Sequence, residues 1–310
     1  MRALITGIAG QDGSYLAESL LKKGYKVFGL VPRRAKNNYA NISRIKEDIT
    51  LLSGDVTDFV SIFAAIKKAE PVEIYNLAAQ SFVGVSWTSP VLTTEVNAIG
   101  PVNILEAIKT FNKSIKFYQA STSEMFGNSY PDFCPCSPYG ISKLYAHHIV
   151  DVYRKSYDIF AVSGILFNHD SPRRGEQFFN QKMAKAAVLA WSGKLKAKVK
   201  VGNLLPCRDI GHAKDYVEAM WLMLQNSTPT DYEVASGKTY SCADIAAKCF
   251  DLVGLNYLDH IVQDAEFYRP LELNILKGNP EKIKEDLNWE PTYTLTTILE
   301  EMVSSQLAYL

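Results

Sequence analysis

Short apolar runs alternate with amphipathic stretches along the first two thirds of the chain. The apolar runs are rich in Val, Ile, Phe and Tyr, which is typical of buried strands. The intervening stretches repeat apolar residues every three or four positions, which is the period of one helix face. This alternation predicts βαβ units and a mostly parallel sheet covered on both faces. Expected strands cover residues 2–7, 25–31, 48–56, 73–79, 115–121 and 160–167, and expected helices include 14–24, 60–70 and 98–111.

The order of elements becomes looser after residue 168. Expected helices there cover 181–194, 215–226, 279–289 and 294–306, with short strands at 198–203 and 231–237. We therefore predict an α/β fold, a Rossmann-like doubly wound domain over residues 1–168 with a smaller mixed α/β lobe over 169–310. Some segments of the second part are expected to return to the first domain.

Composition narrows the class of protein. The chain has 310 residues, with 33 Lys+Arg and 33 Asp+Glu, so no net charge favours nucleic acid or a membrane surface. No run approaches the roughly 20 apolar residues of a membrane span, and the N-terminus enters a strand without a secretory segment. Five scattered cysteines indicate reduced thiols and a cytoplasmic protein. The close pair Cys134 and Cys136 lacks further ligands nearby, so we expect no metal site.

A glycine-rich turn follows the first expected strand. Gly7, Gly10 and Gly13 stand in a G-x-x-G-x-x-G pattern, with Gln11 and Asp12 between them. Glycines at such a turn let the backbone approach a pyrophosphate, which the helix N-terminus then stabilises. A plain tight turn also needs glycine, but the strand–turn–helix context favours dinucleotide binding.

The end of the second expected strand indicates which dinucleotide binds. An NAD site usually carries an acid there for the ribose hydroxyls, yet residues 19–46 contain no Asp or Glu. Arg33 and Arg34 would instead pair with a 2′-phosphate, although a solvated basic loop is the alternative. The sequence therefore predicts NADP. Asp55 and Val56, at the end of the third expected strand, are candidates for an adenine contact.

Tyr139 and Lys143 are four residues apart and share one face of an expected helix. Ser137 can cap this helix and Pro138 can begin it without losing a hydrogen bond. A free tyrosine has a pKa of about 10, too high for a base at neutral pH. A nearby ammonium and the positive ring of an oxidised nicotinamide would both favour the phenolate. The pair is therefore a candidate for proton and hydride transfer chemistry.

The segments "GQDGSYLAE", "YQASTSEMFG", "SPYGISKLYA" and "NHDSPRRGE" make the chain similar to the extended short-chain dehydrogenase/reductase family, and within it to the GDP-mannose 4,6-dehydratases. The similarity covers nearly the whole chain. It implies NADP as cofactor, a GDP-sugar (GDP-mannose above others) as substrate, and a lyase reaction. It also implies a homodimer or homotetramer, in which the loop "RRAKNN" is a candidate for reaching a neighbour's cofactor.

The resemblance also implies roles for individual residues. Thr122, Tyr139 and Lys143 are the hydride-transfer set, and Glu124 serves the elimination of water. Arg208 and Arg269 are expected at the diphosphate. Further cofactor contacts are expected at Leu77, Ala78, Ala79, Gln80, Ser81, His169 and Arg174. Further substrate contacts are expected at Ser81, Ser123, Asn168, Lys182 and Glu272, the last near the guanosine ribose.

Glu124 separates the possible functions. Oxidation at C4 acidifies the C5 hydrogen, so that one carboxylate can remove this proton and then protonate the departing 6-hydroxyl. A 4-epimerase eliminates no water and has no need of the carboxylate. The carboxylate distinguishes a dehydratase from a 4-reductase less well. An NADP-sensing protein without chemistry would not need this set of residues. Each of these residues also has a purely structural interpretation. Glu124 would then only cap the following turn. Arg173 and Arg174 would form surface ion pairs, and His169 would be a structural hydrogen-bonding residue.

Three departures from the family pattern leave the sugar open. The interval between Glu124 and Tyr139 is short, Leu92 stands where a tyrosine near the nicotinamide is usual, and the segment before "FYRP" is shortened. None of these removes a catalytic group. A reduced cover over the site would admit a larger hexose or a heptose, so that GDP-heptose is the alternative substrate.

Overall fold

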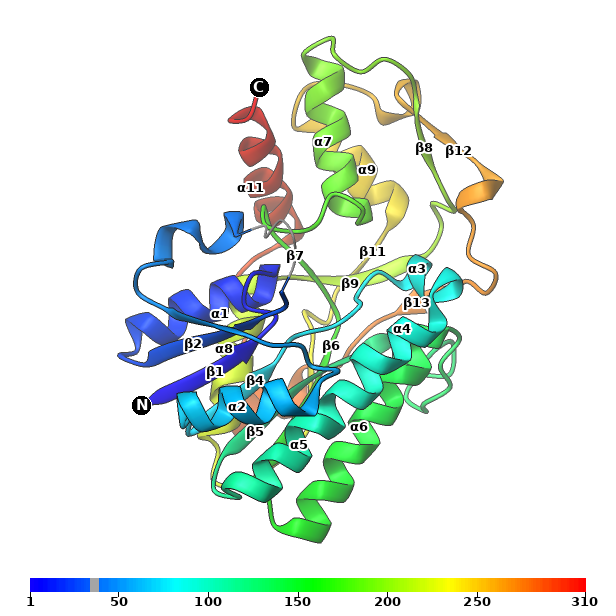
Figure 1. Ribbon diagram of the computed structural model, residues 1–310. Coiled ribbons are helices and arrows are strands. Elements are labelled where there is room, and N and C mark those ends of the chain that lie inside the picture. The colour runs from blue at the N-terminus through cyan, green and yellow to red at the C-terminus, as the bar shows by residue number, and fades with distance from the viewer. Residues whose placement is uncertain (34–38) are drawn as a thin grey trace.

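The computed structural model describes residues 1–33 and 39–310, so Arg34 and the rest of the "RRAKNN" loop up to residue 38 lie outside the described residues. A seven-stranded sheet forms the centre of the larger part (Figure 1), in the order β10-β6-β5-β4-β1-β2-β3. All neighbouring strands are parallel. The strands are β1 (Arg2–Thr6), β2 (Lys26–Val31), β3 (Thr50–Ser53), β4 (Glu73–Asn76), β5 (Lys116–Thr122), β6 (Ala161–Leu166) and β10 (Tyr232–Val234).

Helices cover both faces of this sheet because successive side chains along each strand point to opposite faces. Leu4 packs with α2 (Phe59–Ala69), α5 (Gly100–Phe111) and α6 (Pro138–Tyr157). The next residue, Ile5, packs with α1 (Gln11–Lys22) and α8 (Ala213–Gln225). Each face is a continuous apolar cluster, and the predicted Rossmann-like doubly wound fold is confirmed.

A smaller part carries its own apolar cluster between α7 (Phe179–Trp191), α9 (Cys242–Asp251) and α11 (Leu295–Leu307). Its strand β9 (Cys207–His212) pairs with β7 (Asn168–Asp170), β11 (Thr239–Ser241) and β13 (Ile275–Leu276), and β8 (Val199–Val201) pairs with β12 (Ile261–Gln263). Strand β10 comes from this half of the sequence but lies beside β6 in the large sheet. The division at residue 168 stays a prediction.

Short elements complete the described chain. They are α3 (Val83–Thr88), α4 (Pro90–Thr94), α10 (Glu281–Leu287), the π-helical turn η2 (Glu95–Ile99), and the 3₁₀ turns η1 (Ala40–Ile45), η3 (Ser123–Met125), η4 (Tyr257–Asp259) and η5 (Ala265–Phe267). In the described ranges 1–33 and 39–310, no helix has the length and apolarity of a membrane span.

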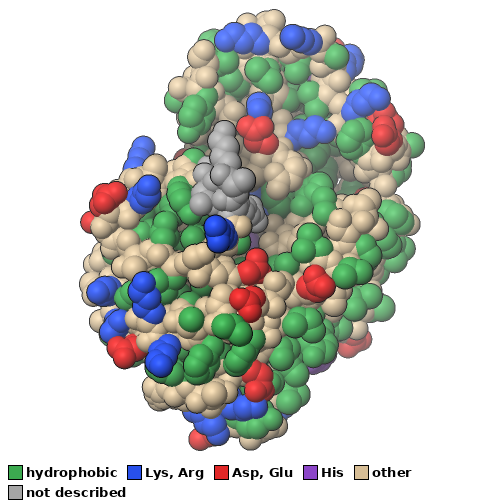
Figure 2. Space-filling view, in the orientation of Figure 1, with side chains coloured by type: hydrophobic (Ala, Val, Ile, Leu, Met, Phe, Trp, Pro, Cys, Tyr) green, Lys and Arg blue, Asp and Glu red, His purple; other side chains and the backbone are tan. Residues whose placement is uncertain are grey.

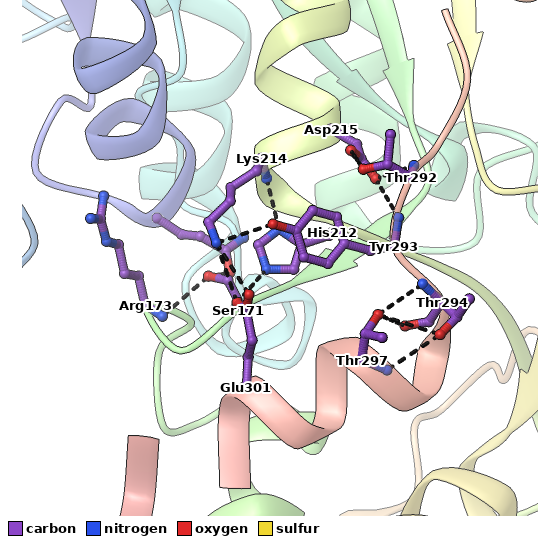
Figure 3. A network of polar contacts seen from close by, with 11 residues as sticks. Ser171, Arg173, His212, Lys214, Asp215, Thr292, Tyr293, Thr294, Thr297 and Glu301 are labelled. Atoms are coloured by element: carbon purple, nitrogen blue, oxygen red, sulfur yellow. Dashed lines mark hydrogen bonds and ion pairs between the residues drawn. The ribbon is translucent and has the colours of Figure 1, made fainter. Parts of the chain in front are cut away.

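A buried polar network joins α11 to the start of α8 (Figure 3). The fully buried His212 accepts the Lys214 backbone N–H at Nδ1, at 2.9 Å, so its proton is at Nε2, 3.0 Å from Glu301 Oε2. Lys214 Nζ also contacts Glu301 Oε1 at 3.2 Å, and the Tyr293 ring stacks on the imidazole at 4.0 Å. Burial lowers the pKa of His212, which agrees with a neutral ring. Glu301 thus supplies the acceptor for two buried or half-buried donors.

Replacing Glu301 with alanine is expected to lower the free energy of unfolding by about 1–3 kcal/mol, because the His212 Nε2–H and the Lys214 ammonium lose their shared acceptor. Urea denaturation followed by circular dichroism measures this. Glu300→Ala is the matched control, because Glu300 is the exposed neighbour on the same helix. Equal stability losses in the two variants would show that the network contributes nothing.

Candidate active site

Two adjoining cavities lie at the carboxyl ends of the parallel strands, where doubly wound sheets bind ligands. The space-filling view shows a waist between the larger and smaller parts of the molecule (Figure 2). A cavity of about 800 Å³ runs along the glycine turn, and one of about 360 Å³ lies between β5, α6 and the smaller part. Residues that line both include Asp12, Leu77, Ala79, Ser81 and Arg174.

The glycine turn is closely packed. Gly7 has φ +71°, and a Cβ there would lie 2.8 Å from the backbone of residues 77–78. A Cβ on Gly13 would lie 2.3 Å from the Gly7 carbonyl oxygen. The Gly10 N–H donates to the same carbonyl at 2.9 Å. Only glycines allow the first turn of α1 to approach β1 this closely, which leaves the start of the helix on the wall of the larger cavity.

Two buried polar residues position the segment 77–81, and the sequence analysis missed both. Thr6 Oγ1 accepts the N–H groups of Leu77 and Ala78, each at 3.1 Å. Asn97, in the π-helical turn, accepts the Gln80 N–H at 2.9 Å and donates to the Gln80 carbonyl at 3.0 Å. Its amide also contacts Ser142 on α6 at 3.3 Å. The local sequence around Asn97, "TTEVNAIG", is too polar to single this residue out, so only its contacts in the fold reveal it.

The far end of the larger cavity holds the predicted adenine contacts. Asp55 and Val56 line it, and Asp55 Oδ1 accepts two hydrogen bonds from Thr57, at 3.0 and 2.8 Å. Pro32 also lines this end. Arg33 is exposed and does not line the larger cavity. Arg34 lies outside the described residues.

A buried ion pair lies where the two cavities meet. His169 Nε2 is 2.8 Å from Asp12 Oδ2, and its Nδ1 is 2.8 Å from the Phe167 carbonyl oxygen, so both ring nitrogens face acceptors. Burial alone would raise the pKa of Asp12, but the charge and hydrogen bond of His169 outweigh burial and lower it. The imidazole is held as a cation, and its pKa is raised despite burial.

The two arginines of "SPRRGE" differ in their partners. Arg174 pairs with Asp170 at 3.2 Å and lines both cavities. Arg173 forms an ion pair with Glu18 at 2.5 Å and lines only the larger cavity among the two described. The ion pairs considered from the sequence are therefore present, and both side chains also face a cavity.

The four predicted catalytic side chains are brought together around the smaller cavity. Thr122 ends β5, Glu124 follows in the turn η3, and Tyr139 and Lys143 lie on α6. The Ser137 side chain accepts the Gly140 N–H at 3.0 Å, so its predicted capping role is confirmed.

Burial dominates the titration of the tyrosine and lysine. It raises the pKa of Tyr139 to about 12, with a partial opposing effect from a hydrogen bond with Thr122. It lowers the pKa of Lys143 to about 8. The Lys143 Nζ donates to the Ala120 carbonyl at 2.9 Å and lies 6.0 Å from the centre of the tyrosine ring. Burial thus raises the tyrosine pKa in the protein without cofactor, and its lowering by the ammonium together with an oxidised nicotinamide stays a prediction.

All predicted substrate contacts line the smaller cavity: Ser81, Ser123, Asn168, Lys182, Arg208, Arg269 and Glu272. Lys182 Nζ donates to the Lys200 carbonyl at 2.6 Å. Arg208 is 8% exposed and lies 3.3 Å from Glu272 Oε1. Arg269 lies 3.3 Å from Glu124 Oε1, a contact between two predicted site residues that the sequence did not suggest.

The short segment between Glu124 and Tyr139 packs against the body of the protein. Phe126 stacks on Phe133 and Phe167, with ring centres 5.1 and 6.1 Å apart. Leu92 is 51% exposed on α4 and lines the larger cavity. All five cysteines are free, and among residues 1–33 and 39–310 no group of ligands for a metal ion occurs.

Comparison with known proteins identifies the family of this chain. The family model described as GDP-mannose 4,6 dehydratase matches residues 4–302. The human GDP-mannose 4,6 dehydratase is 42% identical, with 97% of this chain and 90% of the human protein covered. GDP-mannose 4,6 dehydratase 1 of Arabidopsis thaliana is 43% identical, with coverages of 98% and 89%.

A solved structure with the same fold is the UDP-glucose 4-epimerase of Thermus thermophilus in complex with NAD, at a TM-score of 0.87, 25% identity and full coverage of both chains. Thus the fold is shared with an epimerase at 25% identity, whereas the two GDP-mannose 4,6 dehydratases match nearly the whole chain at 42% and 43% identity. The chain belongs to the GDP-mannose 4,6-dehydratase family, within the extended short-chain dehydrogenases/reductases.

Proposed function

We propose that this protein is a hydro-lyase that converts GDP-mannose to GDP-4-keto-6-deoxymannose. The observation that carries the proposal is the carboxylate of Glu124 in the same cavity as Thr122, Tyr139 and Lys143. A 4-epimerase on this scaffold needs the last three residues and has no step for the carboxylate. Family membership favours the same reaction, because the relatives carry this name at about 40% identity.

The residues divide the reaction between C4 and C5–C6 of the sugar. Tyr139 takes the proton of the 4-hydroxyl while Thr122 holds that oxygen, and Lys143 stabilises the developing phenolate. The chemistry supplied by a bound nicotinamide cofactor is hydride acceptance at C4 and hydride return to C6. Glu124 removes the C5 proton and protonates the departing 6-hydroxyl. Of the two protons removed from O4 and C5, one leaves in the water and one is replaced at C5.

The larger cavity fits a nicotinamide dinucleotide. Its glycine turn leaves no room for side chains at Gly7 or Gly13, which suits a pyrophosphate. Gln80 Oε1 is buried without a hydrogen-bond partner among the described residues and belongs to the cavity wall. For NADP specifically, the support is the absence of an acid in residues 19–46 and the cation Arg33 just beyond β2. NADP is therefore the proposed cofactor.

We propose different roles for the two halves of the chain. Residues 1–168 are proposed to bind the cofactor and carry the catalytic side chains, and residues 169–310 mainly to bind the nucleotide sugar. Lys182, Arg208 and Arg269 put three cationic side chains on the smaller cavity, which suits a diphosphate. The free thiols of all five cysteines support the proposed cytoplasmic location.

Mass spectrometry of GDP-mannose incubated with the protein and a catalytic amount of NADP⁺ tests the function. Loss of one water from the sugar nucleotide without net cofactor reduction is expected, and NAD⁺ in place of NADP⁺ should support slower turnover. Turnover of GDP-heptose alone would assign a different sugar to the same mechanism. Stoichiometric NADPH consumption on a 4-keto sugar would replace the dehydratase with a reductase.

A homodimer or homotetramer is also proposed, supported by an exposed apolar stripe on α6. Ile141, Tyr145 and Val152 are 59%, 47% and 47% exposed and recur along one side of the helix. Such a stripe is typical of helices that pack against a second copy. Tyr145→Glu is expected to halve the mass measured by light scattering, whereas an unchanged mass would exclude this face as the interface.

A further inference from the structure

Arg269 contacts the carboxylate on which the proposed elimination depends. Its Nη1 lies 3.3 Å from Glu124 Oε1, with side-chain exposures of 32% for the arginine and 12% for the glutamate. Within residues 1–33 and 39–310, no second hydrogen bond or ion pair of the Arg269 side chain is found. The pair lies on the wall of the smaller cavity. Glu124 is thus the partner of a guanidinium that the substrate is also expected to use.

The position of Arg269 is set by contacts that do not involve Glu124. The segment 269–274, here called the strap, crosses the site between η5 and β13. Asn128 donates to the Glu272 carbonyl at 3.0 Å and accepts the Asn274 N–H at 2.9 Å. Arg208 donates to another carbonyl of the strap at 2.8 Å. The strap is therefore held on two sides, and it presents Arg269 to the carboxylate.

Such pairing opposes the chemistry proposed for Glu124. The guanidinium donates to Oε1, one of the two carboxylate oxygens that must take a proton from C5 and give one to the 6-hydroxyl. While this contact lasts, that oxygen is not free to reach the sugar. The pair suits a resting state, and catalysis requires that Arg269 find another anion.

A diphosphate is that anion. It carries more charge than one carboxylate and accepts the two parallel hydrogen bonds that a guanidinium can donate. Arg208 already has Glu272 and two backbone carbonyls as partners and is 8% exposed. Arg269 has one side-chain partner and more exposure, so it is the arginine that can change partner by giving up a single contact.

We propose that Arg269 changes partner during the reaction cycle, contacting the Glu124 carboxylate in the free protein and moving to the substrate's diphosphate in the complex. Arg269 is then a positioning residue for Glu124 and couples nucleotide binding to release of the acid–base group. The inference rests on the proposed function for the identity of the anion. It predicts that GDP binds more tightly when Arg269 has no carboxylate to leave.

The affinity for GDP tests the exchange. Glu124→Gln is expected to bind GDP about 2–10-fold more tightly than wild type, because Arg269 no longer leaves a carboxylate to reach the diphosphate. Isothermal titration calorimetry with GDP measures this. Glu266→Gln, which makes the same charge change on the exposed turn η5, should leave the affinity unchanged.

The same substitution in an Arg269→Met background separates the exchange from simple repulsion between Glu124 and the diphosphate. Repulsion would make Glu124→Gln raise the affinity equally in both backgrounds, whereas the exchange predicts a smaller gain once Arg269 is absent. Since glutamine is nearly isosteric, the comparison of Glu124→Gln with wild type holds even where Arg269→Met fails to fold.

An unchanged or lower GDP affinity of Glu124→Gln, or an equal gain in both backgrounds, would overturn the exchange. The dehydration assay with GDP-mannose separates this result from the proposed function. A gain in affinity that depends on Arg269, without water loss in wild type, would keep the partner exchange and remove the dehydratase function. Water loss without that gain would do the reverse, and would leave Arg269 as a diphosphate ligand only.

Discussion

Glu124→Gln is expected to lower the rate of water loss from GDP-mannose by about 10²–10⁴-fold, the usual contribution of a positioned general acid–base group. The amide can neither accept the C5 proton nor protonate the 6-hydroxyl. Cofactor binding should be unchanged, because Glu124 lines the smaller cavity and is not part of the described lining of the larger one. The loss should therefore appear in turnover.

Two measurements check this prediction. Mass spectrometry in D₂O follows both water loss and deuterium entry at C5, and both should fall together because one carboxylate serves both steps. Glu266→Gln is the matched control: it makes the same charge change on the exposed turn η5 of the smaller part. The turn η3 is capped by Thr122, which accepts the Glu124 N–H, so the Glu124 side chain is not the cap. If Glu124→Gln keeps wild-type turnover, the Glu124 side chain serves only its contact with Arg269, and another group performs the elimination.

Much of the larger part could be predicted because its elements are long and strongly periodic. The predicted strands of residues 1–168 all occur, since each contains a short apolar run that is buried in the sheet. Ser137 and Pro138 correctly placed the start of α6, because capping is a local interaction. Here local pattern and tertiary burial agree.

The smaller part was less predictable for a physical reason. Strands β7, β11 and β13 are two or three residues long and are stabilised by pairing with β9 rather than by their own pattern. Helix α9 was missed although the sequence carries its signals, a capping box at Ser241 and Asp244 followed by apolar residues at helical spacing. Strand β10 reads as a local strand, but its place in the large sheet depends on β6.

For the site, the sequence predicts the types of residue present better than their arrangement in space. Motifs and resemblance predicted which side chains line the cavities, since those depend on residue type and local spacing. The partners of these side chains could not be predicted. Arg269 and Glu124 are 145 positions apart, so their contact depends on the path of the strap and not on local spacing. The raised pKa of Tyr139 follows from burial, which no local spacing reveals.

Gly13→Ala is expected to lower the free energy of unfolding by about 1–3 kcal/mol or more and to remove most cofactor binding. The new Cβ would lie 2.3 Å from the Gly7 carbonyl oxygen and 2.6 Å from the Ile8 Cα. Both are backbone atoms, so no side-chain rotation relieves the overlap. Either α1 moves away from β1 or the glycine turn changes shape, and both changes distort the wall of the larger cavity.

Gly24→Ala separates this overlap from ordinary glycine strain. Gly24 has φ +79°, and a Cβ there meets nothing within 4 Å. Alanine at that position should therefore lower stability by only about 1–2 kcal/mol, from the left-handed backbone, and leave cofactor affinity unchanged. Urea denaturation and calorimetric titration with NADP⁺ measure both quantities. If Gly13→Ala binds NADP⁺ as tightly as Gly24→Ala, the turn of α1 is not the pyrophosphate site, and the cofactor assignment of the larger cavity fails with it.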